Sequence, residues 1–173
     1  EWMDYLDERQ LTIKKYRINY LQNSLVGVTR KDNYKLKRIK NIEDFKNILL
    51  TTKSRISLAM TMSVPAGIYT KSYLENIDIW KDIKSNIVES PNVRAAMKFI
   101  SRGELDLGIV YYSDAIAENK IKIIYFLEEY YHKNITYPLT VLNEKESTLN
   151  FYKFLIAENS KSIMKKWGFK TNK

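Results

Sequence analysis

The fold prediction starts from MTMSVPAGIYTKSYLENIDIW, residues 60–80. Residues 56–62 (ISLAMTM) are mostly apolar and predict a buried strand, and residues 68–80 carry the pattern of a helix. The turn between them, residues 63–67 (SVPAG), is short and contains no acid, histidine or cysteine. A buried strand that leads through a short turn into a helix is typical of α/β proteins.

The rest of the chain repeats this alternation of strands and helices. The clearest helix opens with Ser90 as N-cap and Pro91 in the first helical position, and it ends at Gly103. Further strands are expected at 20–29, with a break near 22–23, and at 107–111, 121–126 and 137–142. Further helices are expected from Trp2, after an N-cap at Asn41, and over 149–156 and 160–167. This alternation predicts an α/β fold with a largely parallel sheet.

The composition fits a folded protein and excludes several kinds of site. A chain of 173 residues can build one sizeable core or two small lobes. The absence of cysteine excludes disulfides and thiolate metal sites, and a single histidine, His132, excludes a His-rich metal site. No apolar run is long enough for a transmembrane helix, and no signal peptide is visible. Because the chain begins with Glu1, we expect a mature or cut product.

The charge balance is strongly basic, with 29 Lys and Arg against 20 Asp and Glu and a net charge of +9. Residues 30–40 alone hold six cations and one acid, which indicates a solvated loop. Such a surplus can indicate a nucleic-acid partner. Only seven of the cations are Arg, however, and Arg is the residue that recognises phosphates and bases best. The bias therefore favours a solvated basic surface, and a nucleic-acid-associated α/β domain remains the alternative.

Two strand-to-helix turns are candidates for binding an anion. In open α/β sheets, ligands bind beyond the carboxyl ends of the strands, where helices begin. The first N–H groups of a helix have no partner within the helix and carry partial positive charge, so two helix starts can form an anion site from backbone alone. The turns in question hold Ala66 with Gly67, and Val93, and the small residues would let a ligand approach closely. Most such turns bind nothing, so both interpretations stay open.

A third candidate is Tyr111, which ends a strand and could donate its hydroxyl to a ligand or be a half-buried core residue. Motifs for catalysis or phosphate binding (GxSxG, HExxH, DxDxDG, GxxxxGK[ST]) are absent, and we expect no enzyme. The acids Glu128, Glu129 and Asp106 are interpreted as solvated, and His132 as a histidine at the surface or at a lobe edge.

Several motifs in fixed order resemble one known family. They are SVPAGIYTKSYLE, SPNVRAAMKFISRGELDLGIVYYSDA, ITYPLTVL and KKWGF, preceded by WMDYL and LQNSLVGV. Together they closely resemble the molybdate-binding proteins of bacterial ABC importers, and the likeness spans essentially the whole chain. The resemblance implies a type II periplasmic binding protein fold, in which two α/β lobes joined by crossing strands close on an oxyanion.

The resemblance also implies site residues, a ligand and a partner. The backbone N–H groups of Ala66 and Val93 and the hydroxyl of Tyr111 match the family's oxyanion donors. The ligand would be molybdate or tungstate, with no cofactor and no metal bound directly by protein atoms. The partner would be the permease of an ABC importer in the inner membrane, with no nucleic acid. The protein would be periplasmic or lipid-anchored outside the cytoplasm, and a monomer when complete.

The sequence departs from the family pattern at its start. The family's serine donors, in an Ala-Ala-Ser-Leu turn and a later serine pair, are absent. Residues 25–135 are therefore expected to form a complete second lobe, and residues 1–24 and 136–173 only part of the first. A truncated remnant that no longer transports is an alternative. A regulatory effector domain is another, although no helix-turn-helix is visible.

Overall fold

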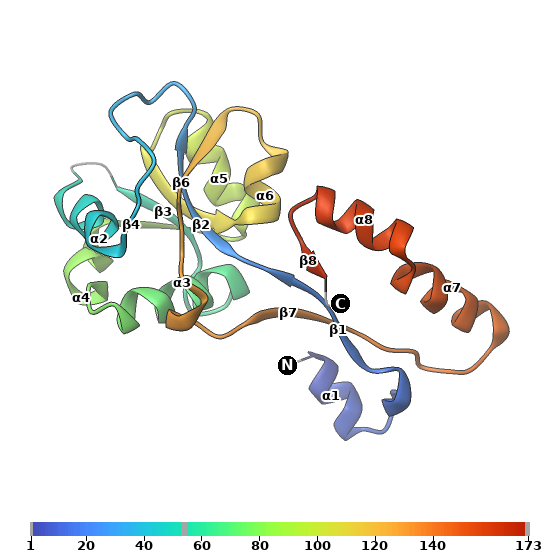
Figure 1. Ribbon diagram of the computed structural model, residues 1–173. Helices are drawn as coiled ribbons and strands as arrows, with labels where there is room; N and C mark the ends of the chain where they lie inside the picture. The colour runs from blue at the N-terminus through green and yellow to red at the C-terminus, as the bar shows by residue number, and fades with distance from the viewer. Residues whose placement is uncertain (1, 53–54, 172–173) are drawn as a thin grey trace. The chain divides into compact units, whose positions relative to one another are not determined.

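The computed structural model describes residues 2–52 and 55–171 (Figure 1). The chain divides into two compact units, one made of Glu1–Asn23 with Ile135–Lys173 and the other of Ser24–Asn134. We call them the flanking unit and the central unit. That these units correspond to a partial first lobe and a complete second lobe stays a prediction.

The central unit is built on a five-stranded sheet in the order β4-β3-β5-β2-β6. The strands are β2 (Leu25–Arg30), β3 (Ile56–Ala59), β4 (Ile87–Ser90), β5 (Leu107–Tyr111) and β6 (Ile121–Phe126). β3 runs parallel to β4 and β5, whereas β2 runs antiparallel to β5 and β6. The expectation of a largely parallel sheet is therefore wrong, and the sheet is mixed. An apolar run marks a buried strand but carries no information about its direction.

Helices cover this sheet. They are α2 (Ile42–Thr51), α3 (Pro65–Asn76), α4 (Trp80–Ile83), α5 (Val93–Ser101) and α6 (Tyr112–Ala117), with 3-10 turns η2 (Lys84–Asn86) and η3 (Glu129–Tyr131). α5 and α6 lie side by side (Figure 1) and pack with the sheet around a cluster that includes Val26, Ile100 and Val110. The ring of Phe45 on α2 stacks on Tyr125 of β6 at 4.4 Å. Each fully buried side chain of this size stabilises the fold by about 1.5–3 kcal/mol.

Several local predictions for the central unit are confirmed and others are shifted. Asn41 caps α2, since its side chain accepts a bond from the Asp44 N–H at 2.8 Å. Residues 31–40 hold no helix or strand. β3 ends at Ala59 rather than at residue 62, and α3 begins at Pro65 rather than at residue 68. β4 was not predicted, because IVES is too short and too polar to stand out as a strand.

The flanking unit has its own three-stranded antiparallel sheet, in the order β7-β1-β8. Its elements are α1 (Trp2–Glu8), η1 (Lys14–Tyr16), β1 (Ile18–Asn23), β7 (Ile135–Leu139), α7 (Glu146–Ile156), α8 (Glu158–Lys166) and β8 (Lys170–Thr171). The hydroxyl of Tyr20 on β1 donates to the carbonyl of Leu155 on α7 at 2.6 Å and ties the helix to the strand. The break expected near residues 22–23 in the strand over 20–29 is confirmed with a small shift, since β1 ends at Asn23 and β2 begins at Leu25.

Candidate anion-binding site

Three strand ends of the central unit meet at one edge of its sheet. β4, β3 and β5 are adjacent and mutually parallel, so their carboxyl ends share that edge. A helix begins shortly after each end: α3 after β3, α5 after β4 and α6 after β5. The three predicted site residues Ala66, Val93 and Tyr111 all belong to these strand ends or helix starts. The topology therefore brings them to the same edge, which is where α/β sheets bind ligands.

The start of α3 has backbone donors and no side-chain cap. Its N-cap is Val64, whose side chain cannot accept a hydrogen bond, and Pro65 fills the first position. The first bond of the helix runs from the Ile68 N–H to the Val64 carbonyl at 2.9 Å. The N–H of Ala66 precedes that bond, in the first turn where helices bind anions. Ala66 itself is buried, with 2% of its surface exposed.

Gly67 has a packing role at this helix start. A Cβ added to it would come closer than 3.0 Å to the carbonyl oxygens of Ala59 and Met60 at the end of β3. The glycine therefore lets the helix backbone pack directly against the strand backbone. The interpretation that Gly67 opens the turn for a ligand is replaced by this one, because its open side faces the protein's own carbonyls.

The start of α5 differs from the predicted one by two residues. Asn92 is the N-cap, with its side-chain oxygen accepting from the Ala95 N–H at 2.8 Å. The prediction of Ser90 as N-cap and Pro91 in the first helical position is wrong, because Ser90 is the last residue of β4. The first backbone bond of the helix runs from Ala96 to the Asn92 carbonyl at 3.1 Å. The N–H of Val93 precedes it, as at the start of α3.

Ser90 and Tyr111 complete this edge. Ser90 is 1% exposed, and its Oγ has no hydrogen-bond partner among the described residues. Tyr111 is half-buried at the end of β5, where it pairs with Leu25 of β2 and serves as the N-cap residue of α6. The backbone fixes this position further, because the next N–H, that of Tyr112, donates to the Ser24 carbonyl at 2.8 Å.

An ion pair that the sequence reasoning missed links two of the helix starts. Arg94 Nε lies 3.4 Å from Asp114 Oδ1, and these residues stand in the first turns of α5 and α6. The Arg94 side chain is 81% exposed, so the pair contributes little to stability. The sequence contained a signal for this ion pair, because both charged residues stand close to predicted site residues: Arg94 follows Val93 directly, and Asp114 lies three residues after Tyr111.

A second polar group of the central unit involves Tyr73, in the C-terminal half of α3. The hydroxyl of Tyr73 donates to Glu128 at 2.6 Å, and the hydroxyl of Tyr125 donates to the other oxygen of the same carboxylate. Burial, and next the bond to Glu128, raise the pKa of both tyrosines well above its usual range. The interpretation of Glu128 as solvated is therefore wrong, because the residue is half-buried between two tyrosines.

The histidine was also misplaced by the sequence reasoning. His132 is 7% exposed and lies near Tyr69 and Tyr73, with ring centroids 6.3 Å apart in each case. Its Nδ1 is 2.8 Å from the Lys133 carbonyl, and its Nε2 has no partner among the described residues. The expectation of a histidine at the surface is wrong, because the ring is buried beside Tyr69 and Tyr73 of α3. The alternative, a histidine at a lobe edge, stays a prediction. In residues 2–52 and 55–171, no group of three or more His, Cys, Asp or Glu could hold a metal ion.

Comparison with known proteins identifies the family. The family model described as bacterial extracellular solute-binding protein matches residues 1–170. The chain therefore belongs to this family of solute-binding proteins. Over the described part of the chain, no helix has the length and apolarity that a membrane crossing requires.

Two curated relatives are named for molybdate binding and for ABC transport. The chain is 31% identical over 172 residues to the molybdate-binding protein ModA of Escherichia coli, covering 98% of this chain and 66% of that protein. It is 30% identical over 123 residues to the putative ABC transporter substrate-binding lipoprotein YvgL of Bacillus subtilis, covering 69% of this chain and 47% of that protein. The chain thus spans less than two thirds of the length of these relatives.

Solved structures confirm the predicted periplasmic binding protein fold. The substrate-binding domain of a putative molybdenum ABC transporter from Clostridium difficile superimposes with a TM-score of 0.83 at 28% identity, covering 99% of this chain and 73% of that one. The periplasmic molybdate-binding protein of Azotobacter vinelandii gives a TM-score of 0.75 at 18% identity, covering 98% and 74%. At that lower identity the likeness concerns the fold alone.

Proposed function

We propose that this chain binds molybdate or tungstate and, as part of a solute-binding protein, delivers it to the permease of an ABC importer. The observation that carries the proposal is the shared sheet edge, where the backbone N–H groups of Ala66 and Val93 precede the first bonds of their helices beside the strand end at Tyr111. Relatives named for molybdate binding and for ABC transport support the choice of ligand and partner.

The chemistry of these donors suits a tetrahedral dianion. Helix starts carry partial positive charge, and N–H bonds to a charged oxygen are stronger than bonds between neutral groups. A site made of neutral donors needs no buried Lys or Arg, and it distinguishes anions by the placement of the donors. Molybdate and tungstate are larger than sulfate, so the spacing of the donors at Ala66, Val93 and Tyr111 would set the preference. The proposed activity is binding and release, without catalysis.

The setting of the proposed function is outside the cytoplasm. The family consists of extracellular solute-binding proteins, and one relative is described as a lipoprotein. A location in the periplasm or at the outer face of a membrane follows for this protein as part of the proposal. The partner is then a membrane permease, and the complete protein would act as a monomer without nucleic acid.

The test is a thermal melt of the chain with molybdate, tungstate, sulfate or phosphate in separate samples. At an anion concentration of about one hundred times the dissociation constant, a working site adds about 2.7 kcal/mol of stability. For a protein of this size that raises the melting temperature by roughly 5–10 °C. We expect this shift with molybdate and tungstate and a smaller one with sulfate. The absence of a shift with every oxyanion would contradict the proposal for this chain.

A paired substitution tests the residues. Tyr111→Phe removes only the hydroxyl, and loss of one hydrogen bond to a charged ligand weakens binding by about 1.5–3 kcal/mol, or roughly 10- to 150-fold. The control is Tyr130→Phe, which removes the same atom from a side chain that is 90% exposed. Calorimetric titration with molybdate should show a weaker affinity for the first variant and an unchanged one for the second. Equal affinities would remove Tyr111 from the site.

A further inference from the structure

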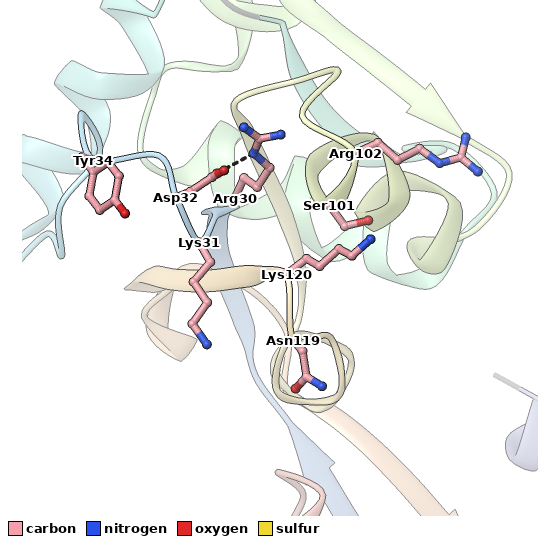
Figure 2. Close-up of a pocket in the computed structure, with 8 residues that line it drawn as sticks. All are labelled: Arg30, Lys31, Asp32, Tyr34, Ser101, Arg102, Asn119 and Lys120. Carbon is pink, nitrogen blue, oxygen red and sulfur yellow. Dashed lines mark hydrogen bonds and ion pairs between the residues drawn. The ribbon is translucent and has the colours of Figure 1, made fainter.

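A cavity of about 580 Å³ lies at the edge of the central sheet opposite the candidate anion site. β2 is antiparallel to β5, so Arg30 at the end of β2 lies at the amino end of β5, whereas Tyr111 lies at its carboxyl end. Figure 2 shows the residues that line the cavity, which come from the end of β2 and the loop after it, the end of α5 and the turn before β6. We call it the basic pocket, and its lining residues are Arg30, Lys31, Asp32, Tyr34, Ser101, Arg102, Asn119 and Lys120.

The lining of the basic pocket is cationic and rich in donors. Four of its residues are Lys or Arg, and Asp32 is its one carboxylate. The remaining residues (Tyr34, Ser101 and Asn119) all offer hydrogen-bond donors. Part of the cationic loop at residues 30–40, which the candidate anion site does not use, is thereby brought together with cations from two other segments.

Backbone and side-chain bonds hold this lining in place. The N–H of Lys31 donates to the carbonyl of Lys120 at 2.8 Å, so the two lysines stand on segments that are tied together. The ammonium group of Lys122 donates to the carbonyl of Asn33 at 2.7 Å and anchors the loop after β2. In Figure 2, the Lys120 side chain extends toward Ser101 at the end of α5.

Arg30 is positioned from two sides. Its Nε pairs with Asp32 Oδ1 at 2.5 Å, drawn as the dashed line in Figure 2. Its guanidinium also packs against Gly103, where an added Cβ would come closer than 3.0 Å to Nη1. Gly103 has φ of +76°, a conformation that other residues rarely adopt. The glycine that ends α5 thus also makes room for the guanidinium.

Helix termination alone does not explain the cations. The carboxyl end of a helix carries partial negative charge, and this accounts for Arg102, which directly follows α5. It does not account for Lys31 and Lys120, which come from the segments that flank β2 and β6. The partial negative charge also opposes an anion, so any ligand of the basic pocket must gain its binding energy from the four cationic side chains.

We propose that the basic pocket binds a phosphate group, as a second anion site independent of the oxyanion site. Lys and Arg are the side chains that bind phosphate, Arg through its fork and Lys as a point charge. Asp32 pairs with Arg30, and Glu104 lies 3.7 Å from Arg102, so the charge surplus of the basic pocket rests on Lys31 and Lys120. A group with two negative charges matches this surplus, whereas the candidate oxyanion site offers neutral donors. The phosphate can belong to a free phosphate compound or to a lipid headgroup, and the experiment separates these two sources.

The first experiment uses pyrophosphate as the probe and the whole 173-residue chain, with molybdate present in excess to occupy the other site. The test variant carries Lys31→Gln and Lys120→Gln. The control variant carries Lys81→Gln and Lys84→Gln, two exposed lysines elsewhere on the central unit, so both variants lose the same charge. Calorimetric titration should show an affinity about tenfold weaker for the test variant, as expected for two exposed charge pairs, and one within about twofold of wild type for the control.

The second experiment uses vesicles. The wild-type chain should co-sediment with phosphatidylglycerol vesicles if the ligand is a lipid headgroup. This interpretation is supported if the test variant no longer co-sediments and if pyrophosphate releases the wild-type chain from the vesicles. Binding of pyrophosphate without binding of these vesicles would support a free phosphate compound. Equal weakening in both double variants would overturn the proposal, because charge alone would then explain binding. Failure of pyrophosphate to bind at about 10 mM, with a DNA duplex bound instead, would overturn it in favour of a nucleic-acid surface.

Discussion

Replacing Gly67 by Ala gives the sharpest test of how the candidate anion site is built. Two arguments predict opposite signs for this substitution. In a helix where the new Cβ contacts no other part of the protein, Gly→Ala stabilises the folded state by up to about 1 kcal/mol, because alanine has the better helix propensity. In this structure the new Cβ would meet the carbonyl oxygens of Ala59 and Met60, and both are backbone atoms that cannot rotate away.

The steric effect should win. An ordinary Cβ contact begins at 3.4 Å, so the start of α3 or the end of β3 must move by about 1 Å. Overpacking of this kind costs about 1–3 kcal/mol, and contact with two fixed carbonyls places Gly67→Ala at the upper end. After the gain in helix propensity, the net loss is about 2 kcal/mol, which lowers the melting temperature by roughly 4–8 °C.

The assay is urea unfolding followed by circular dichroism, without any anion present. Ser72→Ala on the same helix is the control, because it makes a change of similar size without a new backbone contact, and it should stay within about 0.5 kcal/mol of wild type. A Gly67→Ala variant as stable as wild type, or more stable, would refute the reasoning. Since no ligand enters this measurement, its outcome is independent of the proposed function.

Three further predictions concern other parts of the chain. Asn92→Ala should lose about 1 kcal/mol of stability in urea unfolding through loss of the α5 cap, and Asn92→Asp, which keeps the cap, should not. The pKa of Tyr73 and Tyr125 is raised in the folded state, so their contribution to stability is complete below about pH 10 and is lost as the pH rises further. Urea unfolding midpoints measured from pH 8 to 11 should therefore fall less steeply with pH in the Tyr73→Phe variant than in wild type. An identical slope for the two proteins would contradict this. Phe151 and Phe154 stack on each other and are each 61% exposed, and exposed apolar pairs promote self-association. Replacing both by Ser should decrease the self-association seen in size-exclusion chromatography. An unchanged elution profile would contradict this prediction.

Features encoded by neighbouring residues could be predicted from the sequence. Asn41 caps α2 as expected, and β5 and β6 have the predicted bounds, because a cap or a buried strand depends on residues within a few positions. The change from strand to helix was recognised for the same reason, although the turn predicted at residues 63–67 ends before Pro65, where α3 begins. The turn joins a short apolar run to a helix whose first position is a proline, a residue that favours helix starts.

Features set by distant residues could not be predicted. The burial of His132 depends on Tyr69 and Tyr73, which lie about sixty residues earlier in the chain. The direction of β2 depends on its pairing with β5, and an apolar strand has the same composition in either direction. The error at Ser90 has a different origin, since Ser90 and Asn92 are both good N-cap residues. The structure selects Asn92 because β4 extends through Ser90 to pair with β3.

Charge and geometry have different roles in the two sites proposed at opposite ends of the central sheet. The net charge of +9 gives no information about the candidate oxyanion site, where the proposed donors at Ala66, Val93 and Tyr111 are neutral. A site of that kind cannot rely on long-range attraction to select its ligand, so its selectivity must come from the spacing of its donors. The Gly67→Ala substitution moves the start of α3 and the end of β3 relative to each other by about 1 Å, so it should change the ratio of molybdate to sulfate affinity as well as stability. A variant that loses stability but keeps this ratio would place the determinant of selectivity outside α3.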